Sequence, residues 1–129
     1  MKKLLVLILF TFVSISMMAQ VTTSSIRGKI TDNNNDPLPG ATIVATHIPS
    51  GTQYFVVADF HGNYCLMNIR PGGPYSIEVR FVGYQTSIIK GVSALLGETL
   101  FMNVHMKDYS QANNMEKTLN QSAYNQLNY

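Results

Sequence analysis

The sequence predicts an all-β domain, a β-sandwich of about seven short strands. Glycines punctuate the chain at positions 40, 51, 62 and 73, and this is the strand spacing typical of a sandwich or barrel. The segments between them either alternate apolar and polar residues or are rich in β-branched and aromatic residues. No long window between residues 24 and 107 keeps the 3.6-residue apolar period of a helix. We therefore expect strands throughout this region.

The first residues have the composition of a secretory signal peptide. Lys2 and Lys3 precede an apolar run that begins at Leu4, and small residues follow as far as Ala19. A basic start, a short apolar run and a small residue before the cut define such a peptide. The run is well short of the roughly 20 residues that span a bilayer as a helix, which disfavours the alternative of an uncleaved membrane anchor. We expect residues 1–19 to be a signal peptide, with cleavage after Ser16 as the alternative cut.

The charge balance argues against a nucleic-acid partner. Of nine Lys and Arg residues the leader holds two, so seven remain against seven Asp and Glu residues. A formally neutral chain without a Lys/Arg cluster lacks the basic surface that follows a phosphate backbone.

Alternation of apolar and polar residues predicts where individual strands lie. It is strongest at residues 75–81, where odd-numbered positions are apolar and the positions between them are polar, and it recurs at residues 26–31 and 100–107. Such alternation predicts strands with one buried face. Residues 41–48 and 53–58 are rich in β-branched and aromatic residues but leave open which face is buried. Residues 86–92 are a weaker candidate strand.

Turn residues separate these segments. Residues 38–41 and the pair Pro71–Gly72 place Pro before Gly, which suits the centre of a type II turn. Residues 48–51 and 59–62 suit type I turns, with Pro second or Asp first and Gly last. Pro74 lacks an amide hydrogen and is expected to delay strand pairing until the next residue.

The composition changes after residue 107. Residues 108–129 are dominated by Asn, Gln, Ser and Tyr, and such a segment has too few apolar residues to bury. We expect a polar, mobile tail, with a short helix around residues 115–127 as the alternative.

The succession GKITDNNNDPLPGATIVA and DFHGNYCLMNIRPGGPYSIEVRFVGYQT resembles the carboxypeptidase regulatory-like domain. The resemblance covers residues 25 to about 107. It implies that residues 20–107 form a seven-stranded transthyretin-like (prealbumin-like) sandwich. The matching fold-motif positions are Gly28, Pro39, Gly40, Asp59, Gly62, Tyr64, Pro71, Gly72, Tyr75, Gly83 and Tyr84.

The chain is more specifically similar to TonB-dependent outer-membrane receptors of the Oar and SusC type in Bacteroidetes. The similarity lies in the leader, the early position of this domain and the segment GGPYSIEVRFVGYQT. In those receptors, the resemblance implies, the domain lies in the periplasm ahead of a plug and a nutrient-importing β-barrel. The printed sequence shows no plug, barrel strands or TonB box after Lys107. We therefore expect an exported interaction module of the periplasm or outer membrane, either a truncated receptor or a free module. Its partner would be a cell-envelope protein: a receptor plug or barrel, or a partner lipoprotein.

No catalytic or cofactor site is expected. A phosphate loop leads from a strand into a helix N-terminus, whereas Gly72–Gly73 leads into a strand and Pro74 removes one amide donor. The sequence contains no GxSxG nucleophile elbow. The resemblance to transthyretin-like folds invites comparison with a hydrolase of purine breakdown products that has this fold. Its terminal Tyr-Arg-Gly-Ser signature is missing from SAYNQLNY. The sequence therefore predicts a protein that is not an enzyme.

Metal binding and thiol chemistry are not expected either. His47, His61 and His105 lack the spacing of metal ligands. Cys65 is the only cysteine, so an exported chain of this composition has no internal disulfide. We expect Cys65 to be packed in a strand like a small hydrophobic residue.

Carbohydrate binding is the alternative function. Aromatic rings offer flat apolar faces for such contacts, but the chain has no Trp. Tyr64, Tyr75 and Tyr84 occupy fold-motif positions and are expected in the core or at corners. Tyr54 remains as the candidate glycan contact.

Overall fold

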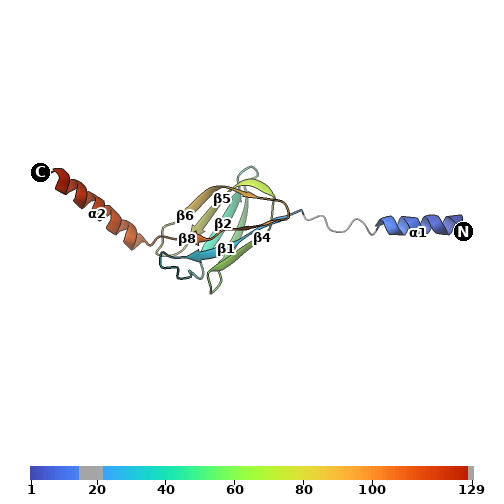
Figure 1. Cartoon of the computed structure of the whole chain (residues 1–129), viewed down its shortest axis with the longest axis horizontal. Helices are drawn as coiled ribbons and strands as arrows, with labels where there is room; N and C mark the ends of the chain where they lie inside the picture. The colour runs from blue at the N-terminus through green and yellow to red at the C-terminus, as the bar shows by residue number, and fades with distance from the viewer. Residues whose placement is uncertain (15–21, 128–129) are drawn as a thin grey trace.

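The computed structural model describes residues 1–14 and 22–127. Most of the described chain between residues 24 and 105 forms strands (Figure 1). The elements in chain order are α1 (Lys2–Ser14), β1 (Ser24–Thr31), β2 (Thr42–His47), β3 (Thr52–Val57), β4 (Asn63–Ile69), β5 (Gly72–Arg80), β6 (Ser87–Ala94), β7 (Thr99–Phe101), β8 (Val104–His105) and α2 (Tyr109–Leu127).

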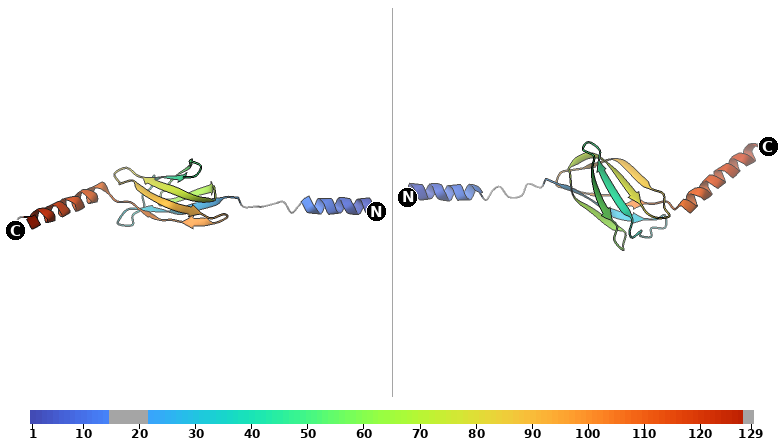
Figure 2. Two further views of the ribbon diagram at one scale, coloured as in Figure 1. Left: turned by 90° about the horizontal axis from the view of Figure 1, so that it is seen from above. Right: turned by 180° about the vertical axis from the view of Figure 1, so that it is seen from behind.

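The strands form two sheets that pack face to face (Figure 2), which confirms the predicted β-sandwich. One sheet has the order β4-β1-β7, with β8 pairing farther along β1, and the other has the order β3-β2-β5-β6. β1 pairs antiparallel with β4 but parallel with β7 and β8.

The described strands number eight: β4 lies in none of the segments named from the sequence, and the predicted last strand is divided into β7 and β8. At the division, the Met102 amide donates to the Arg27 carbonyl (2.7 Å) and the Lys29 amide donates to the Asn103 side-chain oxygen (2.9 Å). The Asn103 side chain thus replaces a backbone acceptor for the Lys29 amide. The last strand therefore pairs with β1 in two separate segments, β7 and β8.

The core lies between the sheets and is made by the predicted alternation. Among the described residues, the buried core cluster runs from Ile26 to Met106. The strand register also shows which side chains of β2 and β3 face the core, a point that the sequence left open. β2 pairs with β3 so that Ile43 lies opposite Val56 and Ala45 opposite Tyr54, and these residues face the core.

The turns follow the predicted chemistry with one adjustment. The Ala41 amide donates to the Leu38 carbonyl (3.3 Å) and the Gly62 amide donates to the Asp59 carbonyl (2.9 Å), as expected. The Gly51 amide instead donates to the His47 carbonyl (2.7 Å), so this turn is one residue wider than predicted.

β5 begins before the expected residue. Gly72 already pairs with Ala94 of β6, and Tyr75 pairs with Val92 after one register shift. Regular pairing with β6 begins at Ser76, after a second shift. Pro74, which follows a cis peptide bond, occupies the interruption. The prediction that Pro74 interrupts pairing is therefore confirmed, but the strand starts at Gly72.

Residues 109–127 form a helix, in agreement with the alternative that the sequence offered for this segment. α2 runs from Tyr109 to Leu127, longer than the expected alternative. The Ser110 amide donates to the Asp108 side chain (2.8 Å), so Asp108 caps the helix. Asp108 followed three residues later by Gln111 resembles a capping box, and this signal marks the helix start. The mobility of the segment stays a prediction.

At the other end of the chain, α1 contains the two leader lysines and an apolar sequence. No helix of the described residues is long and apolar enough to cross a membrane. Both expected cleavage sites, after Ser16 and after Ala19, lie outside the described residues.

Candidate binding surface

The side of the β3-β2-β5-β6 sheet that points away from the core is the candidate binding surface, and we call it the outer face. The paired registers place alternate side chains of the four strands on it. These side chains are Gln53, Phe55 and Val57 of β3, Thr42, Val44 and Thr46 of β2, Ser76, Glu78 and Arg80 of β5, and Ile88 and Lys90 of β6.

Apolar side chains at both margins of the outer face are exposed to solvent. Phe55 and Val57 are 66% and 59% exposed, and Ile88 at the opposite margin is 55% exposed. Between them Val44 is only 9% exposed, because Phe55 and Glu78 are its cross-strand neighbours. Exposed apolar groups bordered by polar groups are typical of interaction surfaces.

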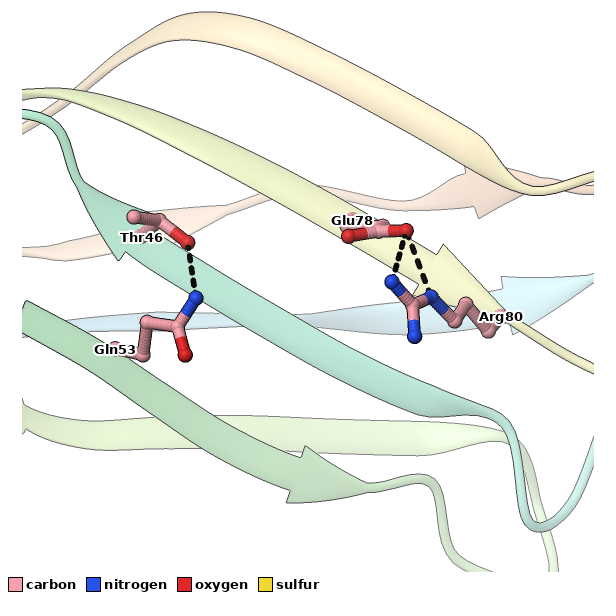
Figure 3. A network of polar contacts seen from close by, with 4 residues as sticks. All are labelled: Thr46, Gln53, Glu78 and Arg80. Atoms are coloured by element: carbon pink, nitrogen blue, oxygen red, sulfur yellow. Dashed lines mark hydrogen bonds and ion pairs between the residues drawn. The ribbon is translucent and has the colours of Figure 1, made fainter. Parts of the chain in front are cut away.

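Four of the polar residues of the outer face form two pairs (Figure 3). The Arg80 guanidinium contacts one Glu78 carboxylate oxygen through Nε and Nη2, each at 2.7 Å. Hydrogen bonding and attraction to this carboxylate raise the pKa of Arg80. The Gln53 amide nitrogen donates to the Thr46 hydroxyl at 3.4 Å. The outer face therefore combines exposed apolar groups with one ion pair and the exposed Lys90.

The sequence did not identify this surface. β2 carries apolar residues in succession, Ile43, Val44 and Ala45, so its period does not reveal which side is buried. Only the pairing partners on β3 and β5 decide that Phe55 and Val57 point outward.

Two of the fold-motif residues, Gly28 and Tyr64, form a close contact inside the other sheet. A Cβ atom on Gly28 would lie 1.7 Å from the Met102 carbonyl oxygen and 3.0 Å from the Tyr64 ring. The Tyr64 hydroxyl donates to the same carbonyl at 2.7 Å. Burial raises the pKa of Tyr64 to about 12. These residues hold the last strand against β1.

A second group of motif residues lies at the start of β5. Tyr75 is fully buried, and its hydroxyl donates to the Arg70 carbonyl at 2.6 Å. Burial raises the pKa of Tyr75 to about 12, with the nearby Tyr54 as a further cause. The His47 ring centroid lies 5.0 Å from that of Tyr75. This group anchors the bend that leads into β5.

Tyr54, the candidate glycan contact, belongs to the same group. Its hydroxyl accepts a hydrogen bond from the Arg70 amide (3.1 Å), and its ring centroid lies 6.3 Å from that of Tyr75. The side chain is half-buried and packs against the core cluster. Such a placement favours packing over an open platform for a sugar ring.

Tyr84 forms the corner expected of it. It follows Gly83, whose φ of +84° favours glycine, and its ring centroid lies 5.6 Å from that of Phe81. The pKa of Tyr84 is raised, first by burial and then by nearby carboxylates, Asp32 foremost.

The structure does not bring the histidines together. His47 lies beside the Ser50 hydroxyl (2.7 Å) and His105 beside the Thr31 hydroxyl (2.7 Å), while His61 is exposed in a turn. Among the described residues, no group of three or more His, Cys, Asp or Glu side chains is placed to hold a metal ion.

Cys65 lies in β4, and its side chain is partly buried. Its sulfur accepts a hydrogen bond from Arg27 Nε at 3.1 Å. Arg27 and Cys65 are cross-strand neighbours in β1 and β4, so the contact lies on the solvent side of the other sheet.

The two-sheet architecture is that of a prealbumin-like β-sandwich. The sequence model of the carboxypeptidase regulatory-like domain matches residues 25–107, and the chain belongs to this family. Domains of this family are non-catalytic β-sandwich modules. The search of curated proteins found no match.

Solved structures share the fold at low sequence identity. The Bacillus anthracis TIE protein is similar with a TM-score of 0.57 and 20% identity, over 67% of this chain and 17% of that chain. Hydroxyquinol 1,2-dioxygenase from Pseudomonas putida DLL-E4 has a TM-score of 0.55 and 8% identity, over 70% and 58%. A candidate carbohydrate-binding protein from Bacteroides uniformis ATCC 8492 has a TM-score of 0.53 and 13% identity, over 66% and 41%. This chain spans less than two thirds of each, and the likeness shows the fold alone.

Proposed function

We propose that this protein is a non-catalytic, exported interaction module of the cell envelope. In this proposal it serves as the periplasmic N-terminal domain of a TonB-dependent outer-membrane nutrient receptor, or as a remnant of one. The observation that carries the proposal is the outer face, where Phe55, Val57 and Ile88 are exposed on a regular four-stranded sheet. Because the strands hold these side chains in fixed positions, the surface is prepared to contact a partner.

The geometry of the described residues supports a role without catalysis. Two pairs of polar groups lie on the outer face, Glu78–Arg80 and Thr46–Gln53. Neither pair places a nucleophile beside a general base, which nucleophilic catalysis requires. Membership of a family of non-catalytic sandwiches agrees with this interpretation.

The leader supports export. Lys2 and Lys3 begin α1 and precede its apolar residues, and this is the arrangement of a signal peptide. Expression of the full chain and mass determination of the exported product should give a new N-terminus at Gln20, or at Met17 if cleavage follows Ser16. Recovery of the chain with Met1 in the cytoplasm would contradict export.

The partner is tested by photo-crosslinking in the producing cell. A photoreactive amino acid at Ile88 samples the outer face, and one at Met67, which is 61% exposed on β4 of the other sheet, is the matched control. The expected result is an adduct from position 88, identified by mass spectrometry as a receptor plug or barrel or an outer-membrane lipoprotein. Equal adducts from both positions, or none from position 88, would contradict the proposal.

Carbohydrate binding is the second candidate. The fold shared with the candidate carbohydrate-binding protein of Bacteroides uniformis favours it, whereas the engaged hydroxyl of Tyr54 disfavours the expected contact residue. Glycan-array binding that is lost in Tyr54→Ala and kept in the exposed control Tyr124→Ala would support it. The absence of binding to any glycan is the result that the interaction-module proposal expects.

A further inference from the structure

The β3 edge differs from the other edges of the two sheets. Exposed edges of strands are templates for pairing, and proteins protect them with charge, short length or irregular backbone. β7 and β8 are three and two residues long. β6 carries exposed Lys90 and, next to it, Gly91 at a φ of +77°.

The edge of β4 is obstructed at both ends. The Asn63 carbonyl already accepts a hydrogen bond from the Asp59 amide (2.9 Å) in the preceding turn. Asn68, near the other end, has a φ of +55° and interrupts the extended backbone. By contrast, β3 has six residues, TQYFVV, with no charge, proline or positive φ.

The hydrogen bonds at the end of β3 show which of its backbone groups are free. The Ala58 amide donates to the Ala41 carbonyl (2.8 Å), and the Ala58 carbonyl accepts from the Gly40 amide (3.0 Å). Ala58 therefore turns both groups toward β2. Because alternate residues of an antiparallel strand turn to the same side, Val56 and Tyr54 also face β2. The amides and carbonyls of the residues between them, Gln53, Phe55 and Val57, face the open edge.

Gln53, Phe55 and Val57 are arranged to pair with the same three residues of a second copy of the chain. If an identical strand lies antiparallel with Phe55 opposite Phe55 of the second copy, Gln53 lies opposite Val57 of the second copy. In this register each opposed pair turns its free groups toward the other and exchanges two backbone hydrogen bonds. The same three side chains lie on the outer face, so the two phenylalanine rings become cross-strand neighbours, a favourable aromatic pair.

We propose that two copies of this chain associate through antiparallel pairing of β3 about a two-fold axis at Phe55. The two β3-β2-β5-β6 sheets then form one continuous eight-stranded sheet with a shared outer face. The uncharged β3 edge brings no like charges together, whereas self-pairing of β6 would bring Lys90 near its own copy. Because a two-fold contact uses the same edge of both copies, association stops at the dimer.

The dimer does not depend on the envelope partner proposed above, and its test needs no partner. Residues 22–129, which contain the described core cluster, are studied by sedimentation velocity over a concentration series. The wild type should sediment as a monomer–dimer equilibrium without larger species. Phe55→Lys places two ammonium groups at the axis and should weaken the dimer at least about tenfold. Ile88→Lys makes the same change on the same face at the other edge and should leave the dimer unchanged.

A charge pair tests the register. Gln53→Lys combined with Val57→Glu places the new ammonium group of each copy opposite the new carboxylate of the other, on both sides of the axis. The double variant should dimerise more strongly than either single variant, and salt should reduce the difference. In a register with Gln53 opposite itself, the Gln53→Lys change would bring two ammonium groups together and weaken the dimer instead.

Three outcomes overturn the proposal. They are a wild type that remains monomeric at about 1 mM, a dimer weakened by Ile88→Lys and not by Phe55→Lys, and a double variant weaker than both single variants. Circular dichroism of each variant should match the wild type, because both Phe55 and Ile88 are at exposed positions. A failed crosslink from position 88 with an intact dimer would contradict only the envelope partner.

Discussion

At Gly28 a single missing side chain allows the last strand to approach the first. The Met102 carbonyl occupies the place of the Cβ atom, and the Tyr64 hydroxyl bonds to that carbonyl. The family resemblance identified both positions, but their sequence separation concealed that they serve one contact. The sequence was enough to predict that Gly28 and Tyr64 belong to the fold motif. That they meet at the Met102 carbonyl could be seen only once the strands were paired.

Gly28→Ala should destabilise the domain strongly. The new methyl group would overlap backbone atoms, which cannot rotate away, so we expect a loss of about 3 kcal/mol in the free energy of unfolding. Gly51→Ala is the control, because its Cβ atom would meet nothing within 4 Å; the positive φ alone should cost about 1 kcal/mol. Urea unfolding of residues 22–129 measures both, and equal losses would contradict the contact.

Because Tyr64 and Tyr75 are buried, the free energy of unfolding should depend on pH in the alkaline range. Their pKa is about 12 in the folded protein against an ordinary value of 10, so the folded state holds its protons more tightly than the unfolded state. The contribution is complete below pH 10 and is lost as the pH rises toward 12. We expect the free energy of unfolding to fall over this range, and to fall less in Tyr64→Phe. An unchanged decline in that variant would exclude Tyr64 as a source.

At the scale of elements, alternation predicted a strand well only where one face is polar. β5 alternates cleanly and was located from the sequence, although its start at Gly72 was not. β2 and β3 carry apolar residues on both faces, so the exposed Phe55 could not be separated from the partly buried Val56 by periodicity. The outer face was missed for this reason. α2 was expected only as the shorter alternative at residues 115–127, because the polar composition hides a start that Asp108 caps.

The two faces of the β3-β2-β5-β6 sheet should respond differently to the same substitution. Ile77 of β5 is fully buried, whereas Ile88 of β6 points outward. Ile77→Ala leaves a cavity and should cost about 3 kcal/mol, while Ile88→Ala should cost about 0.5 kcal/mol or less. Chemical unfolding compares them, and similar costs would contradict the assigned faces.

For the whole molecule, the core cluster ends before α2 begins. Met106 is its last member, and exposed apolar residues of α2 such as Leu119 lie outside it. Ending the chain after Asp108 keeps the bridge between Tyr84 and Asp108 and the bond from the Gln85 amide to the Lys107 carbonyl. We expect the free energy of unfolding to change by no more than about 0.5 kcal/mol. A larger loss, measured in urea, would show that the helix supports the sheets.

The parallel pairing of β1 with β7 and β8 has a mechanical consequence. The chain enters the domain at the start of β1 and leaves it beyond the end of β8, so the two attachment points lie at opposite ends of the sandwich (Figure 1). A force that pulls these points apart slides neighbouring parallel strands along each other. It loads their hydrogen bonds together, in shear, and does not open them one at a time. A domain connected in this way transmits tension along its length while its sheets remain closed.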